Sequence, residues 1–162
     1  MAASFPGAIK TFTTKTAGAG ILSEHVNAIQ EEVVAIETAI GVNPAKWTNW
    51  TCTPTGWAAG YTAITRYLLI GKICWFEIYI TGTSNNATTS LTLPFTSANI
   101  TNLNWSSANA SSTDAGTLLT TPSRWAIAAN SNAIVFLKDM ANGAFTASGG
   151  KTIRAQGFFE VA

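Results

Sequence analysis

The sequence contains few charged residues, and this shortage limits what kind of protein it can be. Among 162 residues there are nine Lys and Arg, eight Asp and Glu and one His, which gives a formal net charge of +1. A soluble globular domain usually has about a quarter of its residues charged. The basic residues are scattered and form no run, which argues against a nucleic-acid surface. We infer from the low charge that part of the surface is covered by further copies of the chain or by another partner.

Long apolar runs, a secretion signal and a cysteine framework are also missing. No stretch approaches the roughly 20 apolar residues that cross a bilayer, and the N-terminus lacks the apolar core of a signal peptide. We therefore expect synthesis in the cytosol and no membrane insertion. Two cysteines, Cys52 and Cys74, do not make a disulfide framework and are interpreted as small buried apolar residues.

Residue types that carry catalysis or hold cofactors are scarce. The single histidine, His25, falls on the flank of a predicted helix, where it is interpreted as a solvated residue and not as part of a catalytic triad. No His/Cys cluster suits zinc, no acidic loop suits calcium, and no Gly-rich loop suits a phosphate. The acidic residues after position 42 are far apart in sequence, whereas a glycosidase needs two carboxylates at one site. The sequence thus predicts no catalytic residue, no cofactor and no metal site, in a protein that is not an enzyme.

A heptad pattern is the clearest positive signal. Ser23 suits a helix N-cap, and Gly41 with Pro44 suits its C-terminal stop. Branched residues at both seam positions favour three or four helices over two, and we choose a homotrimer. A helix that packs on its own β-domain is the alternative, because fewer than three full heptads are present. The predicted trimer seam has apolar residues at alternating steps of four and three: Leu22, Val26, Ile29, Val33, Ile36 and Ile40.

From about Trp47 onward the pattern is that of β-strands. Gly71-Lys72 suits the turn of a hairpin whose second strand runs from Ile73 to Thr81. Both faces of that strand are largely apolar, so we place it in a sandwich core or at a subunit interface, with Trp75 interpreted as core. Within it, Glu77 is expected to pair with Arg66, Arg124 or Arg154. Further strands are expected at 90–95, 125–129, 134–137, 144–147 and 152–161, with a hairpin turn at Asn142-Gly143.

The frequent turns and about eight strands indicate a mainly β chain whose larger part is an antiparallel β-sandwich, jelly-roll-like in type. Residues 96–121, rich in Ser, Asn, Thr and Ala, are expected to form a long exposed loop or weak edge strands. Trp105 lies in this polar segment and is the candidate for a possible receptor contact, since aromatic rings stack on sugar rings. Trp47, Trp50 and Trp57 are interpreted as packing residues at the junction between helix and sandwich.

A family resemblance enters through the segments 4–12, 25–37 and 41–44, whose sequences are SFPGAIKTF, HVNAIQEEVVAIE and GVNP. Together they resemble the N-terminal module of bacteriophage tail-fibre and minor virion structural proteins, in which a short arm and helix precede variable C-terminal modules. Residues 66–80 and 90–95 are similar in style to the β-domains of such fibres. The resemblance implies a homotrimer in the virion, made in the host cytoplasm, whose arm docks to other virion proteins. The docking residues it implies are Phe5, Pro6, Ile9 and Phe12.

These inferences combine into one expected organisation: a virion-docking arm at residues 1–20, a coiled-coil helix at 21–41 and a β-sandwich domain at 42–162. The expected function is that of a trimeric tail-fibre-like appendage involved in host receptor binding or adhesion, with a cell-surface glycan or protein as receptor. The alternative is a head fibre or capsid decoration protein that binds the capsid without a receptor role. The short chain length favours this alternative, because a fibre of this size reaches little beyond the particle.

Overall fold

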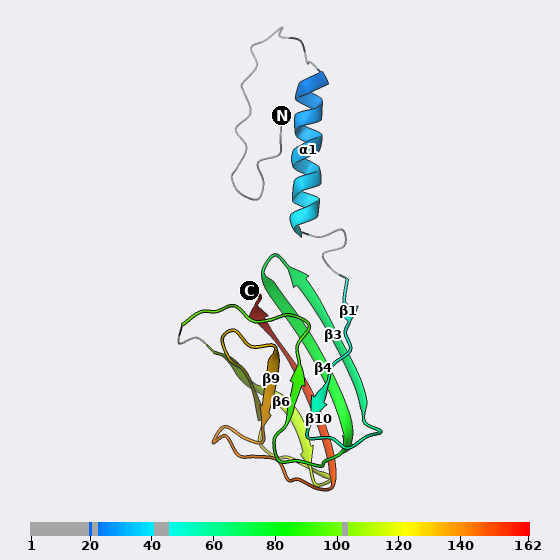
Figure 1. The fold of residues 1–162 in the computed structure, drawn as a ribbon, viewed down its shortest axis with the longest axis vertical. Helices are drawn as coiled ribbons and strands as arrows, with labels where there is room; N and C mark the ends of the chain where they lie inside the picture. The colour runs from blue at the N-terminus through cyan, green and yellow to red at the C-terminus, as the bar shows by residue number, and fades with distance from the viewer. Residues whose placement is uncertain (1–19, 21–22, 41–45, 102–103) are drawn as a thin grey trace. The chain divides into compact units, whose positions relative to one another are not determined.

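The computed structural model describes residue 20 and residues 23–40, 46–101 and 104–162 (Figure 1). The chain divides into two compact units, residues 1–45 and Lys46–Ala162. Over the described residues, no helix combines the length and the apolar character that crossing a membrane requires. The chain is mainly β, as expected from the sequence.

The first unit contains helix α1 (Ser23–Ile40), in agreement with the helix predicted from the heptad pattern. Glu24 lies in its first turn, where a negative charge interacts favourably with the helix dipole. Four of the predicted seam residues are between 40% and 53% exposed in the single chain: Val26, Ile29, Val33 and Ile36. The side chains of Leu22 and Ile40 lie outside the described residues, as do the predicted docking residues Phe5, Pro6, Ile9 and Phe12.

The second unit is one curled antiparallel sheet. Its strands are β1 (Thr48–Asn49), β2 (Pro54–Thr55), β3 (Thr62–Ile70), β4 (Ile73–Thr83), β5 (Ser90–Thr92), β6 (Trp105–Asp114), β7 (Thr117–Leu118), β8 (Ser123–Ile127), β9 (Ala133–Leu137) and β10 (Gly150–Glu160). Their order is β1-β3-β4-β10-β6-β8-β9-β5-β2, and β7 pairs with β6. Since β6 pairs with both β10 and β8, it carries the sheet around a single core (Figure 1).

The hairpin predicted at Gly71-Lys72 is confirmed. Strands β3 and β4 pair from Thr62 opposite Thr81 to Ile70 opposite Ile73. Gly71 adopts a φ of 57°, a backbone conformation that glycine reaches without steric cost. The final strand β10 pairs with β4 along its whole length. Together with the hairpin it forms three adjacent long strands.

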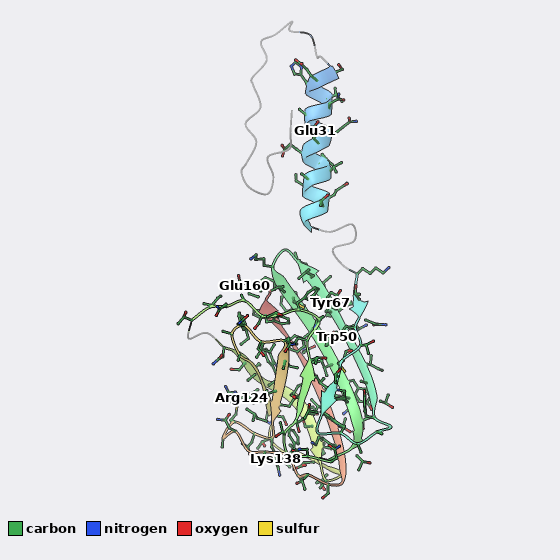
Figure 2. All side chains as sticks on the ribbon, in the orientation of Figure 1. Glu31, Trp50, Tyr67, Arg124, Lys138 and Glu160 are labelled. Atoms are coloured by element: carbon green, nitrogen blue, oxygen red, sulfur yellow. The ribbon has the colours of Figure 1, made fainter. Side chains whose placement is uncertain are left out.

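Alternation along β4 directs Cys74, Phe76, Ile78 and Ile80 into the core. Trp50 and Tyr67 pack against this core with their ring centroids 6.3 Å apart (Figure 2). Both cysteines are buried and free, as the sequence indicated. Burial raises the pKa of the Cys74 thiol to about 12, so this side chain is an apolar packing residue and not a nucleophile.

Two of the expectations about strands and loops are wrong. A long exposed loop or weak edge strands were expected at 96–121, but residues 105–114 form β6, a strand of ten residues that pairs with β10 on one side and β8 on the other. Its inward side chains include Ala110, Ser112 and Asp114, which are too small or too polar to give an apolar signal. Residues 144–147 form no strand. The turn before them exists, with Asn142 at a φ of 66°, but Phe145 then enters the core.

Candidate functional site

The outer face of the sheet carries rows of side chains that change in character along the strands. In one row, Leu68 and Phe158 lie on either side of Trp75. The next row places Arg66 and Gln156 beside Glu77. Near the far end, the hydroxyls of Thr81 and Thr152 are 2.7 Å apart. The Trp75 row of this face is therefore aromatic, and the Thr81 row is polar.

Trp75 and Phe158 form an exposed aromatic pair in the first of these rows. Their ring centroids are 5.0 Å apart and their planes are inclined at 45°. Trp75 is 45% exposed and Phe158 is 49% exposed. The interpretation of Trp75 as a core residue is therefore wrong. The alternation of side chains along β4 was correctly predicted, but the inward face is the one that contains Phe76. Because both faces of this strand are largely apolar, the sequence does not reveal which face is buried.

The sheet splits beside this pair. Strand β6 pairs with β10 only from Ser111 to Thr113 and, after a register shift between Ser107 and Ala110, continues along β8. Asn109 spans the opening: its Nδ2 donates to the carbonyl oxygen of Gln156 at 2.9 Å. The Oδ1 of Asn109 accepts a hydrogen bond from Trp125 Nε1 at 2.7 Å. The amide thus holds the two sides of the split at a defined separation.

The floor of the split depends on a glycine. A Cβ at Gly157 would lie 2.2 Å from Cζ2 of Trp125 and 2.9 Å from Cζ of Phe76. The two rings meet edge to face beneath this position, with centroids 5.1 Å apart. Only the absence of a side chain at this site lets the Trp125 ring approach the backbone of β10 so closely.

The result is a hollow of about 620 Å³. Its aromatic lining comes from five separate segments of the chain: Trp47, Trp75, Phe76, Trp105, Trp125 and Phe158. Its polar lining consists of Glu77, Asn104, Ser106, Ser107, Asn109 and Gln156. Trp105, the contact residue expected from the sequence, is here, half-buried and packed against the core. Trp47 was interpreted from the sequence as a packing residue and Phe158 was not singled out, but both line this hollow. The alternation of β10 could have indicated that Phe158 and the buried Phe159 face opposite sides.

A peptide group also faces the hollow. The carbonyl of Gln156 accepts from Asn109, and the carbonyl of Glu160 accepts from Ala98 N at 2.8 Å. Residues two apart in a strand direct their peptide groups to the same edge. The N–H and C=O of Phe158, which lies between them, are therefore directed towards the split and supply a donor and an acceptor beside the aromatic pair.

The charges at this site compensate each other. Arg66 contacts Oε2 of Glu77 through Nε and Nη2, each at 2.6 Å, so of the three arginines expected as partners it is Arg66 that pairs. Its guanidinium carbon is 5.1 Å from the centroid of the Trp47 ring, a cation–π arrangement. Within the described ranges, no group of three or more His, Cys, Asp and Glu is arranged to hold a metal ion.

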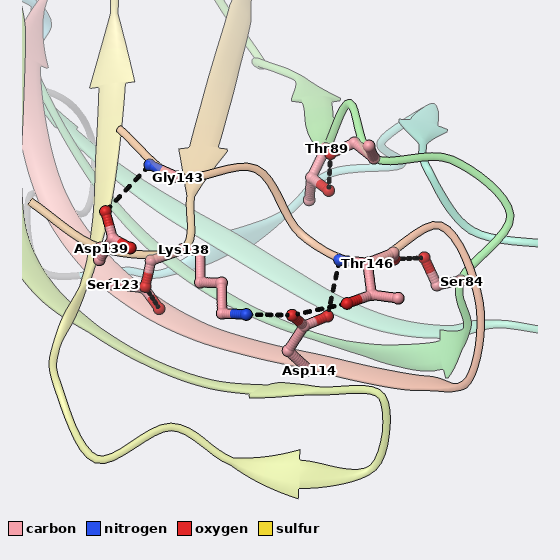
Figure 3. A network of polar contacts seen from close by, with 9 residues as sticks. Ser84, Thr89, Asp114, Ser123, Lys138, Asp139, Gly143 and Thr146 are labelled. Carbon is pink, nitrogen blue, oxygen red and sulfur yellow. Dashed lines mark hydrogen bonds and ion pairs between the residues drawn. The ribbon is translucent and has the colours of Figure 1, made fainter. Parts of the chain in front are cut away.

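A second polar group lies inside one end of the curled sheet and has a structural role. Asp114 accepts hydrogen bonds from Thr146 N at 2.9 Å and Thr146 Oγ1 at 3.1 Å, and its Oδ2 is 2.9 Å from Lys138 Nζ (Figure 3). Burial disfavours the charge of Asp114, but the bonds from Lys138 and Thr146 outweigh burial and hold its pKa below the ordinary value. The carboxylate thereby anchors the segment that follows the Asn142 turn.

Lys151 is buried near this group, with 1% of its surface exposed. Its Nζ donates to the carbonyl oxygens of Gly56 and Asn86 at 3.0 Å and to Thr89 Oγ1 at 2.9 Å. Three donors meet three acceptors, so the ammonium has no hydrogen left for a substrate. Burial lowers the pKa of Lys151 to about 8, with attraction to Asp114 acting in the opposite direction.

No protein-family model matches the chain, and no curated protein matches it. The exposed stripe of α1 and the hollow of the sheet are the two features that bear on function.

Proposed function

We propose that this chain is a non-enzymatic structural subunit of a homotrimeric, fibre-like appendage of a bacteriophage particle. In this proposal, α1 joins three copies and the β unit presents a contact surface to a host receptor. The observation that carries the proposal is the apolar stripe of α1, whose four described seam residues are all at least 40% exposed in one chain.

An 18-residue helix is near the lower length limit at which an isolated helix is stable in water, so its stability depends on packing. The stripe offers a packing surface with the spacing of a coiled-coil seam: Val26, Ile29, Val33 and Ile36. Ile29 and Ile36 occupy the d position, where isoleucine favours three or four helices over two. Three copies of the stripe around one axis would remove these side chains from water.

The β unit contributes the contact surface. We interpret its curled sheet as a sandwich of the jelly-roll type, in which the two halves of the sheet pack across the shared core. Three such units on one coil would bind a repetitive surface jointly, and this increases the overall affinity by about 10² to 10⁴ where the geometry allows simultaneous contact. The resemblance of the N-terminal segments to phage fibre proteins supports a location on the virion, with the arm as its attachment.

Two measurements test the proposal. Light scattering on the purified chain should give a mass near three times 17.0 kDa, and a monomer would contradict the assembly. Antibody labelling of phage particles in electron micrographs should place the protein at the tail. Labelling of the head would instead favour a capsid-bound fibre or decoration protein, and labelling of neither would contradict the virion assignment.

A further inference from the structure

We propose that the hollow between β10 and β6 is a binding site for an uncharged saccharide, with one pyranose ring lying on the Trp75–Phe158 pair. This inference rests on the receptor-contact role proposed above and names the chemical class of the receptor. It does not require the chain to be a trimer, so the two proposals can fail separately.

The aromatic pair provides the apolar half of the site. One face of a pyranose presents C–H groups, and an exposed aromatic ring offers a flat apolar surface against which such a face packs. Trp75 and Phe158 are both about half exposed, and they lie directly opposite each other on paired strands. Held by a continuous ladder of backbone hydrogen bonds, the pair is already in place before a ligand arrives.

Polar groups around the pair provide the other half. The peptide N–H and C=O of Phe158 are directed towards the split, and the Gln156 amide is exposed beside them. Asn104 and Ser106 approach from β6 and the residue before it. Amides, hydroxyls and a peptide group all donate and accept hydrogen bonds, as the hydroxyls of a sugar require. A site in which a few polar groups converge on an apolar surface is typical of small-ligand recognition.

Charge compensation selects for an uncharged ligand. Among the described residues that line the hollow, Glu77 is the only carboxylate, and it is paired with Arg66, which also contacts Trp47. An acidic saccharide would have to compete with Glu77 for the guanidinium, and a cationic ligand would have to displace that guanidinium from the carboxylate. Neither gains a free counter-charge, whereas a neutral hexose or N-acetylhexosamine needs none.

The size and shape of the hollow also favour a sugar over a second copy of the chain. Its volume of about 620 Å³ lies within the range of about 300–1,000 Å³ that is usual for small-ligand sites. A second sheet packed flat on this face would bury the Arg66–Glu77 pair and the Gln156 amide while leaving the concave part empty. The test below distinguishes saccharide binding from contact between copies of the chain.

The test uses the full chain and saturation-transfer NMR with neutral oligosaccharides of glucose, galactose, mannose and N-acetylglucosamine. At least one should bind at millimolar concentration, and sialyllactose, an acidic probe, should bind no better. Trp75→Ala and Phe158→Ala should each lower the affinity by about fivefold to tenfold, which corresponds to the loss of one aromatic contact. Ile64→Ala is the matched control, because Ile64 is 60% exposed on the same face but does not line this hollow.

Two binding results would overturn the inference: no neutral probe binds, or both aromatic variants bind the saccharide as tightly as the wild-type chain does. A lower solution mass of these variants than of the wild type would also overturn it, because the face would then be a contact between copies. The mass of the wild-type chain separates the two proposals. A monomer that binds a neutral saccharide would refute the fibre and keep this site. A trimer that binds no neutral saccharide would support the fibre proposal and refute this site.

Discussion

Nζ of Lys151 lies 3.0 Å from the carbonyl oxygen of Gly56, although 95 residues separate the two in the chain. This contact ties the last strand of the sheet to the segment between β2 and β3. A Cβ at Gly56 would lie 2.3 Å from the carbonyl oxygen of Thr88, so the backbone approaches this closely only because the residue is glycine. The β unit is thus closed at this end by a buried ammonium.

Replacing this lysine should destabilise the β unit. Lys151→Met keeps much of the side-chain length but leaves the acceptors of Gly56, Asn86 and Thr89 without their donor, and we expect a loss of about 2 kcal/mol in the free energy of unfolding. Urea titration followed by tryptophan fluorescence measures it. Lys72→Met, at an exposed turn position, is the control. Equal stability of the Lys151 variant would mean that the cost of burying the ammonium cancels its hydrogen bonds.

The contribution of Lys151 should also depend on pH. Burial lowers its native pKa to about 8, whereas the unfolded value is about 10.4. Between these values the unfolded chain binds more protons than the native chain, so the stability contributed by this group increases as the pH rises. The difference in unfolding free energy between wild type and Lys151→Met should therefore shift in favour of wild type from pH 7.5 to pH 10. A shift in the opposite direction would place the native pKa above the unfolded one.

The carboxylate of Asp114 should stabilise the fold at neutral pH and lose this effect in acid. Its native pKa is held below the ordinary value by Lys138 and Thr146, so its contribution is present above the unfolded pKa of about 3.9 and disappears as the pH falls through the native value. We expect Asp114→Asn to cost about 2 kcal/mol at pH 7 and less as the pH falls below the unfolded pKa. Glu160→Gln, which lies outside this network, serves as the control. A cost that does not change with pH would contradict the ion pair.

The seam of α1 gives the sharpest test of assembly. Ile29→Asp combined with Ile36→Asp would place six carboxylates in a trimeric seam, and we expect this double variant to be monomeric in light scattering. Val34→Asp is the matched control, because Val34 is 59% exposed on the same helix but lies outside the seam. If the double variant keeps the wild-type mass, α1 is not the assembly element.

Gly157 should tolerate no side chain. Gly157→Ala places a methyl group against Trp125 and Phe76, and such overpacking costs about 1–3 kcal/mol. Gly150→Ala is a control in the same strand, since its Cβ would have its nearest neighbour at 3.6 Å, an ordinary contact. Thermal unfolding of both variants measures the difference. Equal melting temperatures would show that the floor of the hollow can shift without cost.

Local patterns in the sequence predicted a substantial part of this fold. The heptad spacing indicated α1, Gly71-Lys72 indicated the β3–β4 hairpin, and the alternation along β4 was correct residue by residue. These features depend on neighbours within a few positions, which is why one sequence is enough to find them. The expected strand at 152–161 likewise matches β10 closely.

The hollow could not be predicted in this way, because it depends on pairing between distant segments. Strand β6 is rich in Ser and Asn, and its central place follows from β10 and β8 on its two sides. The split follows from a register shift at Ser107, and its floor from the missing side chain of Gly157. Trp105 was singled out as a contact candidate by its polar surroundings, and it lines the hollow. Trp75 and Phe158, which also line it, become adjacent only when β4 and β10 pair.

The alternation of β4 and β10 has a consequence for how such a protein changes over generations. Core residues and solvent-facing residues occupy alternate positions in these strands. The outward side chains of Trp75, Glu77, Gln156 and Phe158 can therefore be replaced while the buried Phe76 and Phe159 are kept. If the hollow binds a saccharide as proposed, mutations at the outward positions would alter its specificity at little cost to folding. Gly157 is the exception, because it lines the hollow and also packs against the rings of Trp125 and Phe76. Descendants with new specificities should therefore retain it.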